Sequence, residues 1–85
     1  MESWKLVLDE GAFHFLLAGP ASDRRRLLAI LEQLRGDPHR ALDYQSKDDS
    51  GRDLSIAAIR PFLVTYWLDS FVSEIRIIDI QKVRF

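Results

Sequence analysis

The feature that most constrains the fold is the segment from Ser22 to Pro38, SDRRRLLAILEQLRGDP, which has the pattern of an amphipathic helix. Ser22 is expected to cap its N-terminus, and Gly36 and Pro38 to end it. The apolar residues recur at the helical spacing of three and four, which places them on one face: Leu27, Leu28, Ile30, Leu31 and Leu34. We therefore predict a helix over residues 22–35, and its apolar stripe requires a hydrophobic partner surface.

The rest of the chain supplies that surface as short strands, in which apolar and polar residues alternate or apolar residues run together. The predicted strands are Trp4–Leu8, Leu42–Lys47, Arg52–Ile59, Phe62–Leu68 and Glu74–Val83. The fourth is apolar on both faces, which is typical of a central strand. A polar turn over residues 48–51, with Gly51 at its end, indicates a hairpin between the second and third strands. On the last strand, a period of two would place Glu74, Arg76 and Lys82 on one face.

The segment DEGAFHFLLAG, which follows the first predicted strand, is open to two interpretations. Phe13, Leu16 and Leu17 suit one face of a helix capped by Asp9, whereas AFHFL also alternates like a strand. A Gly-Pro pair ends the element in either case. The order of a strand, helices and then antiparallel strands predicts an α+β domain with helices on one side of a curled sheet.

The chain has 85 residues, a net charge of −1 and no cysteine. This length predicts a single domain over residues 1–85. Neither a cofactor nor a metal ion is expected, and the lack of cysteine fits a cytoplasmic location. No apolar stretch approaches the roughly 18 residues that cross a bilayer, and the N-terminal residues do not predict a signal peptide. The balanced charge contrasts with the basic excess of a dedicated nucleic-acid binder.

Four stretches together resemble the RelE/ParE superfamily, the toxins of bacterial type II toxin–antitoxin modules. They are WKLVLDEGAFHFLLAGPASDRRRLLAILEQLRGDP, DYQSKDDSGRDLSIAAI, RPFLVTYWLD and EIRIIDIQKVRF. The first looks like the family's opening strand and two helices, the second like its hairpin, and the others like its last two strands. The resemblance implies the order β-α-α-β-β-β-β, with two N-terminal helices packed on one face of a curled, mainly antiparallel sheet. It also implies that residues 10–17 are helical.

For function, the resemblance implies a toxin of the plasmid-stabilisation type that a cognate antitoxin protein neutralises by binding it. Ribosome-dependent cleavage of messenger RNA is typical of the RelE branch, and inhibition of DNA gyrase of the ParE branch. An active messenger RNA endonuclease, a gyrase inhibitor and a non-toxic orphan binding domain are therefore the alternatives.

RNA cleavage in this family uses lysines and arginines on the sheet, with a tyrosine or histidine near the C-terminus. The cations stabilise the charge that develops on the phosphorane. By resemblance, the candidate catalytic positions are Lys47, Arg52, Arg60, Lys82 and Arg84. Gln81 and Phe85 stand where an acid–base residue is expected, and neither side chain titrates. We therefore expect antitoxin binding to be the main function, and cleavage of RNA to be poor.

Three successive arginines precede the apolar stripe of the predicted helix. At about 100° per residue, Arg25 points away from the stripe, while Arg24 and Arg26 lie on its opposite flanks. They do not form one phosphate site, and a solvated helix flank is the simplest interpretation. The resemblance suggests more, because antitoxins of this family lay an extended, often acidic segment across the toxin's helices and sheet. We predict that Arg24 and Arg26 lie at or near a protein interface.

Several aromatic residues and one histidine have structural interpretations. His14 is expected to be a partly buried structural residue rather than a catalyst. At least one of Tyr66 and Trp67 should lie in the core, because their strand is the most apolar of the chain. Tyr44 has two interpretations: it either packs against the fold or stacks on a base.

Overall fold

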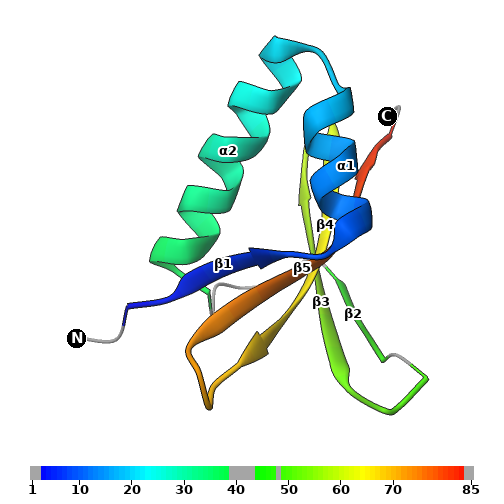
Figure 1. The fold of residues 1–85 in the computed structure, drawn as a ribbon. Helices are drawn as coiled ribbons and strands as arrows, with labels where there is room; N and C mark the ends of the chain where they lie inside the picture. The colour runs from blue at the N-terminus through cyan, green and yellow to red at the C-terminus, as the bar shows by residue number, and fades with distance from the viewer. Residues whose placement is uncertain (1–2, 39–43, 48, 84–85) are drawn as a thin grey trace.

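The computed structural model describes the backbone of residues 3–38, 44–47 and 49–83 (Figure 1). In this part of the chain the elements follow the order that the sequence predicts. They are β1 (Lys5–Leu8), α1 (Glu10–Ala18), α2 (Ala21–Gly36), β2 (Tyr44–Lys47), β3 (Asp53–Ile59), β4 (Phe62–Asp69) and β5 (Glu74–Lys82). Their bounds agree with the predicted ranges to within one residue, apart from β2, whose predicted residues 42 and 43 lie outside the described residues.

The described strands form a five-stranded sheet in the order β1-β5-β4-β3-β2. Strand β1 pairs parallel with β5, and the other neighbouring pairs are antiparallel. Strand β4 lies in the middle of the sheet, as its apolar sequence predicts. Both helices lie on the same side of the twisted sheet (Figure 1). The predicted α+β fold, with a mainly antiparallel sheet, is therefore confirmed.

The segment with two interpretations is the helix α1. This conformation brings Ala12 and Leu16, four residues apart, to the same buried face. Asp9 occupies the N-cap position with an extended backbone, and its carbonyl oxygen accepts from the N–H of Phe13 at 2.9 Å. The Asp9 side chain makes no capping hydrogen bond, so only the predicted position of the cap is correct.

Helix α2 begins and ends one residue outside its predicted range. Its N-cap is Pro20, whose carbonyl oxygen accepts from the N–H of Arg24 at 3.0 Å. The predicted cap at Ser22 is wrong, because this residue already lies in the first helical turn. At the other end Gly36 is the last helical residue and Asp37 is the C-cap.

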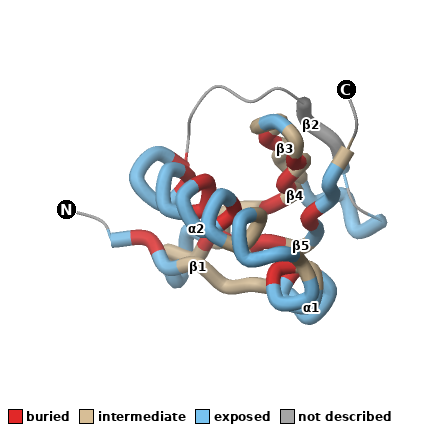
Figure 2. Tube along the Cα trace, turned by 90° about the horizontal axis from the view of Figure 1, so that it is seen from above, coloured by how far each residue is buried: buried red, intermediate tan, exposed pale blue. Residues whose placement is uncertain are grey.

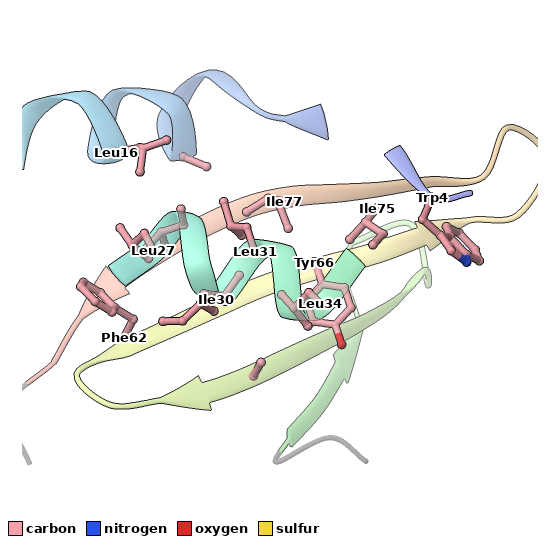
Figure 3. Close-up of a cluster of buried hydrophobic side chains, with 14 residues drawn as sticks. Trp4, Leu16, Leu27, Ile30, Leu31, Leu34, Phe62, Tyr66, Ile75 and Ile77 are labelled. Atoms are coloured by element: carbon pink, nitrogen blue, oxygen red, sulfur yellow. The ribbon is translucent and has the colours of Figure 1, made fainter. Parts of the chain in front are cut away.

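The hydrophobic core lies between α2 and the middle of the sheet (Figure 3). The stripe on α2 packs there as predicted, with the exception of Leu28, which is 49% exposed. Figure 2 shows the same division along α2, whose inner side is buried and whose outer turns are exposed. Tyr66 is fully buried, which confirms that one of the two adjacent aromatic residues of β4 lies in the core. The sheet contributes Ala57, Phe62, Val64, Tyr66, Ile75, Ile77 and Ile80.

A β-bulge in the pairing of β4 with β5 decides which side chains of β5 face the helices. Thr65 pairs with Asp79, but the next residue along β4, Tyr66, pairs with Ile77. Ile78 is therefore an extra residue, and the alternation of faces along β5 shifts at this point. Lys82 lies on the helix side, opposite buried Phe62 in the register, whereas Glu74 and Arg76 lie on the other side. The prediction that these three charged residues share one face is wrong, because it assumed an unbroken period of two.

Candidate functional surfaces

The sheet has one face that neither described helix covers, which we call the open face. Residues paired across neighbouring strands lie on the same face, and successive residues of a strand lie on opposite faces. The register therefore defines the open face without reference to burial. On the three strands β3, β4 and β5 it consists of Leu54, Ile56, Ala58, Leu63, Thr65, Trp67, Asp69, Glu74, Arg76, Asp79 and Gln81.

Two guanidinium groups approach the same indole ring on the open face. The Cζ atom of Arg52 lies over the ring of Trp67, 4.1 Å from its centroid, and that of Arg76 lies 5.8 Å from it. Glu74 adds an ion pair with Arg76, with 3.2 Å between Oε1 and Nη2. That oxygen is buried and makes no hydrogen bond to the described residues, so the contact is an ion pair only. Arg52, Trp67 and Arg76 are called the arginine–tryptophan cluster below.

The structure separates the residues that the resemblance suggests for catalysis. Lys82 points to the start of α2, where its Nζ donates to Oδ2 of Asp23 at 2.8 Å. Arg52 belongs to the open face through its contact with Trp67. Gln81 also lies on the open face, where its amide donates to Oδ2 of Asp79 at 3.1 Å. Lys82 and Arg52 therefore lie on opposite faces of the sheet.

The other three candidate cations lie at the periphery or outside the described residues. The Nζ atom of Lys47 is 3.3 Å from Oδ1 of Asp53, its partner in the register of β2 and β3, and both side chains are exposed. Arg60 is exposed in the turn between β3 and β4. Arg84 lies outside the described residues, as do the side chains of residues 44–46, which include Tyr44.

The three successive arginines of α2 differ in their surroundings. The Nη1 group of Arg24 lies 3.4 Å from the carbonyl oxygen of Leu17, in the last turn of α1. A cation is favourable there because the C-terminal carbonyls carry the negative end of the helix dipole. Arg25 and Arg26 are exposed. His14 is exposed as well, 3.7 Å from Glu10 on the same helix, so its predicted partial burial is wrong.

The helix side also carries a small apolar cavity and exposed apolar side chains. The cavity lies where α1 turns into α2, has a volume of about 320 Å³, and has the ion pair of Lys82 and Asp23 in its wall. Its apolar lining consists of Phe15, Leu16, Ala18, Gly19, Pro20 and Leu27. The exposed large apolar side chains of the two helices are Phe13, Leu17 and Leu28.

The two surfaces offer cations, one partly exposed indole, carboxylates such as Glu74 and Asp79, and apolar side chains. Within residues 3–38, 44–47 and 49–83, no three His, Cys, Asp or Glu side chains gather as a metal site requires. Over the same residues no helix combines the length and the apolar character that crossing a membrane requires.

Sequence analysis singled out Arg52 as a candidate, but it did not predict that Arg52 and Arg76 both lie beside Trp67. The contact between Trp67 and Arg76 depends on the register of β4 with β5, and the bulge at Ile78 sets this register. The sequence shows only that Arg52 precedes one predicted strand and that Trp67 and Arg76 lie on two others. It does not show that the three side chains meet.

Comparison with known proteins places this arrangement in a known fold. No protein-family model matches the sequence, and no curated protein matches it either. Among solved structures, a chain of the archaeal RelE–RelB complex from Pyrococcus horikoshii OT3 matches with a TM-score of 0.73 and 18% sequence identity. The match covers 95% of this chain and 96% of that chain. This chain therefore has a RelE-like fold.

Proposed function

We propose that this protein is a RelE-like toxin or toxin-like component of a toxin–antitoxin module, and that a cognate antitoxin protein neutralises it by binding. The observation that carries the proposal is the RelE-like fold, which extends over 95% of the chain and matches a chain taken from a complex of RelE with RelB. The four sequence stretches that resemble the superfamily support the same conclusion.

The helix side is the surface that we propose for the antitoxin. Phe13 and Leu17 on α1 and Leu28 on α2 are about half exposed. A partner that covers large apolar side chains removes them from water, which makes binding more favourable. Arg26 is exposed on α2, and Arg24 bridges the two helices. We propose Arg24 and Arg26 as partner-binding residues at the rim of this contact, where charge pairs mainly raise the association rate.

Cleavage of messenger RNA is the alternative, with Lys47, Arg52, Arg60, Lys82 and Arg84 as its candidate catalytic residues. Two observations favour antitoxin binding over it. Arg52 and Lys82 lie on opposite faces of the sheet, and Gln81 offers no proton at neutral pH. A general acid or base typically contributes about 10²- to 10⁴-fold in rate, so its lack should leave cleavage slow even on translating ribosomes.

A growth experiment tests the proposal. The chain is induced in a bacterial host, alone and together with the product of the reading frame next to its gene. Growth should slow when the chain is induced alone and recover on co-expression. The variant Leu31→Asp places a charge in the core and serves as the unfolded control. It should not slow growth if the effect requires the folded chain. Equal growth in all three cases would contradict toxicity of this chain. Binding of the antitoxin is measured separately by calorimetry.

A further inference from the structure

The turn between β4 and β5 carries an apolar tip that the described part of the chain leaves uncovered. Phe71 is fully exposed there and Val72 is 54% exposed, although the turn is short and occupies only residues 70–73. A phenylalanine side chain in this position leaves its whole apolar area in water, which is unfavourable. A partner that covers the tip removes this area from water.

Hydrogen bonds hold the turn at both of its ends. Oδ1 of Asp69 accepts from the backbone N–H of Phe71 at 3.2 Å, as in an Asx turn. The carbonyl oxygen of Ser73 accepts from the N–H of Lys5 at 2.9 Å, which ties the turn to β1. Ser73 has a φ of 53°, a left-handed conformation that is uncommon outside glycine. Phe71 is therefore presented from an ordered backbone, which lowers the entropy lost on binding.

The cavity where α1 turns into α2 has the size and the lining to accept an aromatic ring. Its volume is about 320 Å³, and apolar cavities of about 150 Å³ are large enough to bind benzene. Among its lining residues Leu16 and Leu27 are buried, whereas Ala18 and Pro20 are exposed, so the cavity opens to solvent. A phenyl ring that enters it exchanges water for aliphatic contacts.

The tip and the cavity lie at opposite ends of β5, so they do not meet within one molecule. Glu74, the first residue of β5, directly follows the tip, and Lys82, its last residue, lies in the cavity wall. The 9 residues of this strand span roughly 25 Å. Figure 1 shows the β4–β5 turn and the α1–α2 turn at opposite ends of the fold. A contact between tip and cavity is therefore a contact between two copies of the chain.

The charges beside the tip and the cavity are complementary. Asp69 is partly exposed two residues before Phe71, and the side chain of Lys82 is half exposed at the cavity. Lys82 donates to Asp23, but an ammonium group has three N–H donors, so this bond does not exhaust it. A tip that enters the cavity would bring a carboxylate toward this cation. The same carboxylate makes an anionic membrane or a nucleic acid a poor partner for the tip.

We propose that Phe71 of one copy of this chain binds in the cavity of another copy. The inference goes beyond the proposed function, because it requires neither an antitoxin nor toxicity. The contact is small, since one aromatic side chain buries about 150–250 Å², whereas stable complexes bury about 1,200–2,000 Å². Self-association is therefore weak and reversible, with a dissociation constant of about 1 mM.

Sedimentation equilibrium of the purified chain measures this association. The average mass should rise above that of the monomer as the concentration increases from about 20 μM to about 1 mM. Phe71→Ser should weaken association at least about tenfold, as the loss of a buried aromatic anchor does. The control Phe13→Ser removes the same side chain from α1 and should change association by less than about twofold. Thermal unfolding reports whether each variant is folded.

A second pair of variants tests the cavity. Ala18→Glu places a carboxylate at the mouth of the cavity, where an entering ring would remove it from water. It should weaken association about tenfold. The control Ala29→Glu makes the same substitution at an exposed position of α2, and it should change association by less than about twofold.

A mixture of the two defective variants gives the sharpest test. Phe71→Ser keeps its cavity and Ala18→Glu keeps its tip, so each should stay monomeric alone, and their equimolar mixture should associate at about 1 mM. When only Phe71→Ser is ¹⁵N-labelled, the amide resonances of Gly19 and Leu27 at the cavity should move on mixing. When only Ala18→Glu is labelled, the amide resonance of Val72 should move instead.

Five results would overturn the inference. The first three are a native chain that stays monomeric at about 1 mM, a folded Phe71→Ser variant that associates like the native chain, and a mixture that does not associate. Phosphatidylcholine vesicles that move the Val72 resonance of the monomeric chain would assign the tip to a membrane. The product of the neighbouring reading frame would claim the cavity if it moves the Gly19 and Leu27 resonances of a chain that does not associate with itself.

Discussion

At the scale of single residues, the surroundings of a charge decide what it can do. Lys82 is a candidate catalytic residue only by resemblance, and its ammonium group donates to Asp23 at the wall of an apolar cavity on the helix side. Arg24 and Arg26 are two residues apart on α2, yet the guanidinium of Arg24 contacts the last turn of α1 and Arg26 is exposed. Sequence predicted where the three arginines lie around the helix, but not the contact with Leu17.

The double variant Arg24→Ala with Arg26→Ala tests the proposed interface on α2. It should slow association with the antitoxin, most strongly at low salt, because rim charges act through steering. The melting temperature should change little, since the bond of Arg24 to the carbonyl oxygen of Leu17 is long, at 3.4 Å. Stopped-flow association at several salt concentrations measures the first effect and thermal unfolding the second. An unchanged association rate at low salt would leave these arginines as a solvated flank.

At the scale of elements, periodicity predicted α2 and the strands well because each of these apolar patterns has one way to reach the core, whereas it left α1 open between a helix and a strand. The stripe on α2 is buried by its own spacing, and β4 is central because both its faces are apolar. Helix ends were predicted less well: Pro20, rather than Ser22, takes the cap position. The bulge at Ile78 left no sequence signal, since Ile77 and Ile78 have the same chemistry.

Truncation of a leucine in the apolar stripe on α2 should lower the free energy of unfolding, and the loss should be larger for a more deeply buried leucine. Leu31 is 1% exposed and Leu28 is 49% exposed, although they have the same side chain on the same helix. Leu31→Ala should lower the free energy of unfolding by about 2–5 kcal/mol, because it removes contacts and leaves a cavity. Leu28→Ala should lower it by less than about 1 kcal/mol. Denaturation in urea measures both, and equal losses would contradict the placement of this stripe.

Deletion of residues from β5 tests the bulge. Without Ile78 the pairs of Thr65 with Asp79 and of Tyr66 with Ile77 become consecutive, so every remaining side chain keeps its face. This variant should still unfold cooperatively. Deletion of Ile75 should abolish folding, because it shifts Glu74 into a fully buried position, where a charge without a partner costs several kcal/mol. If the chain without Ile78 fails to fold while that without Ile75 folds, the register of β4 and β5 is wrong.

At the scale of the whole molecule, the RelE-like fold presents two surfaces with different chemistry. The helix side offers half-exposed apolar residues with arginines, and the open face offers the partly buried Leu54, Ile56 and Ala58 of β3 with the arginine–tryptophan cluster. The order of elements and the resemblance were enough to predict the fold. They were not enough to predict the surfaces, because cross-strand contacts such as that of Trp67 with Arg76 depend on register rather than composition.

The most direct test of the proposed function is a calorimetric titration of the purified chain with the purified product of the neighbouring reading frame. We predict a saturable complex with a dissociation constant in the nanomolar range, about −12 kcal/mol, and weaker binding at high salt. A titration without binding heat at several temperatures, together with separate elution of the two proteins in size-exclusion chromatography, would contradict an antitoxin-neutralised protein.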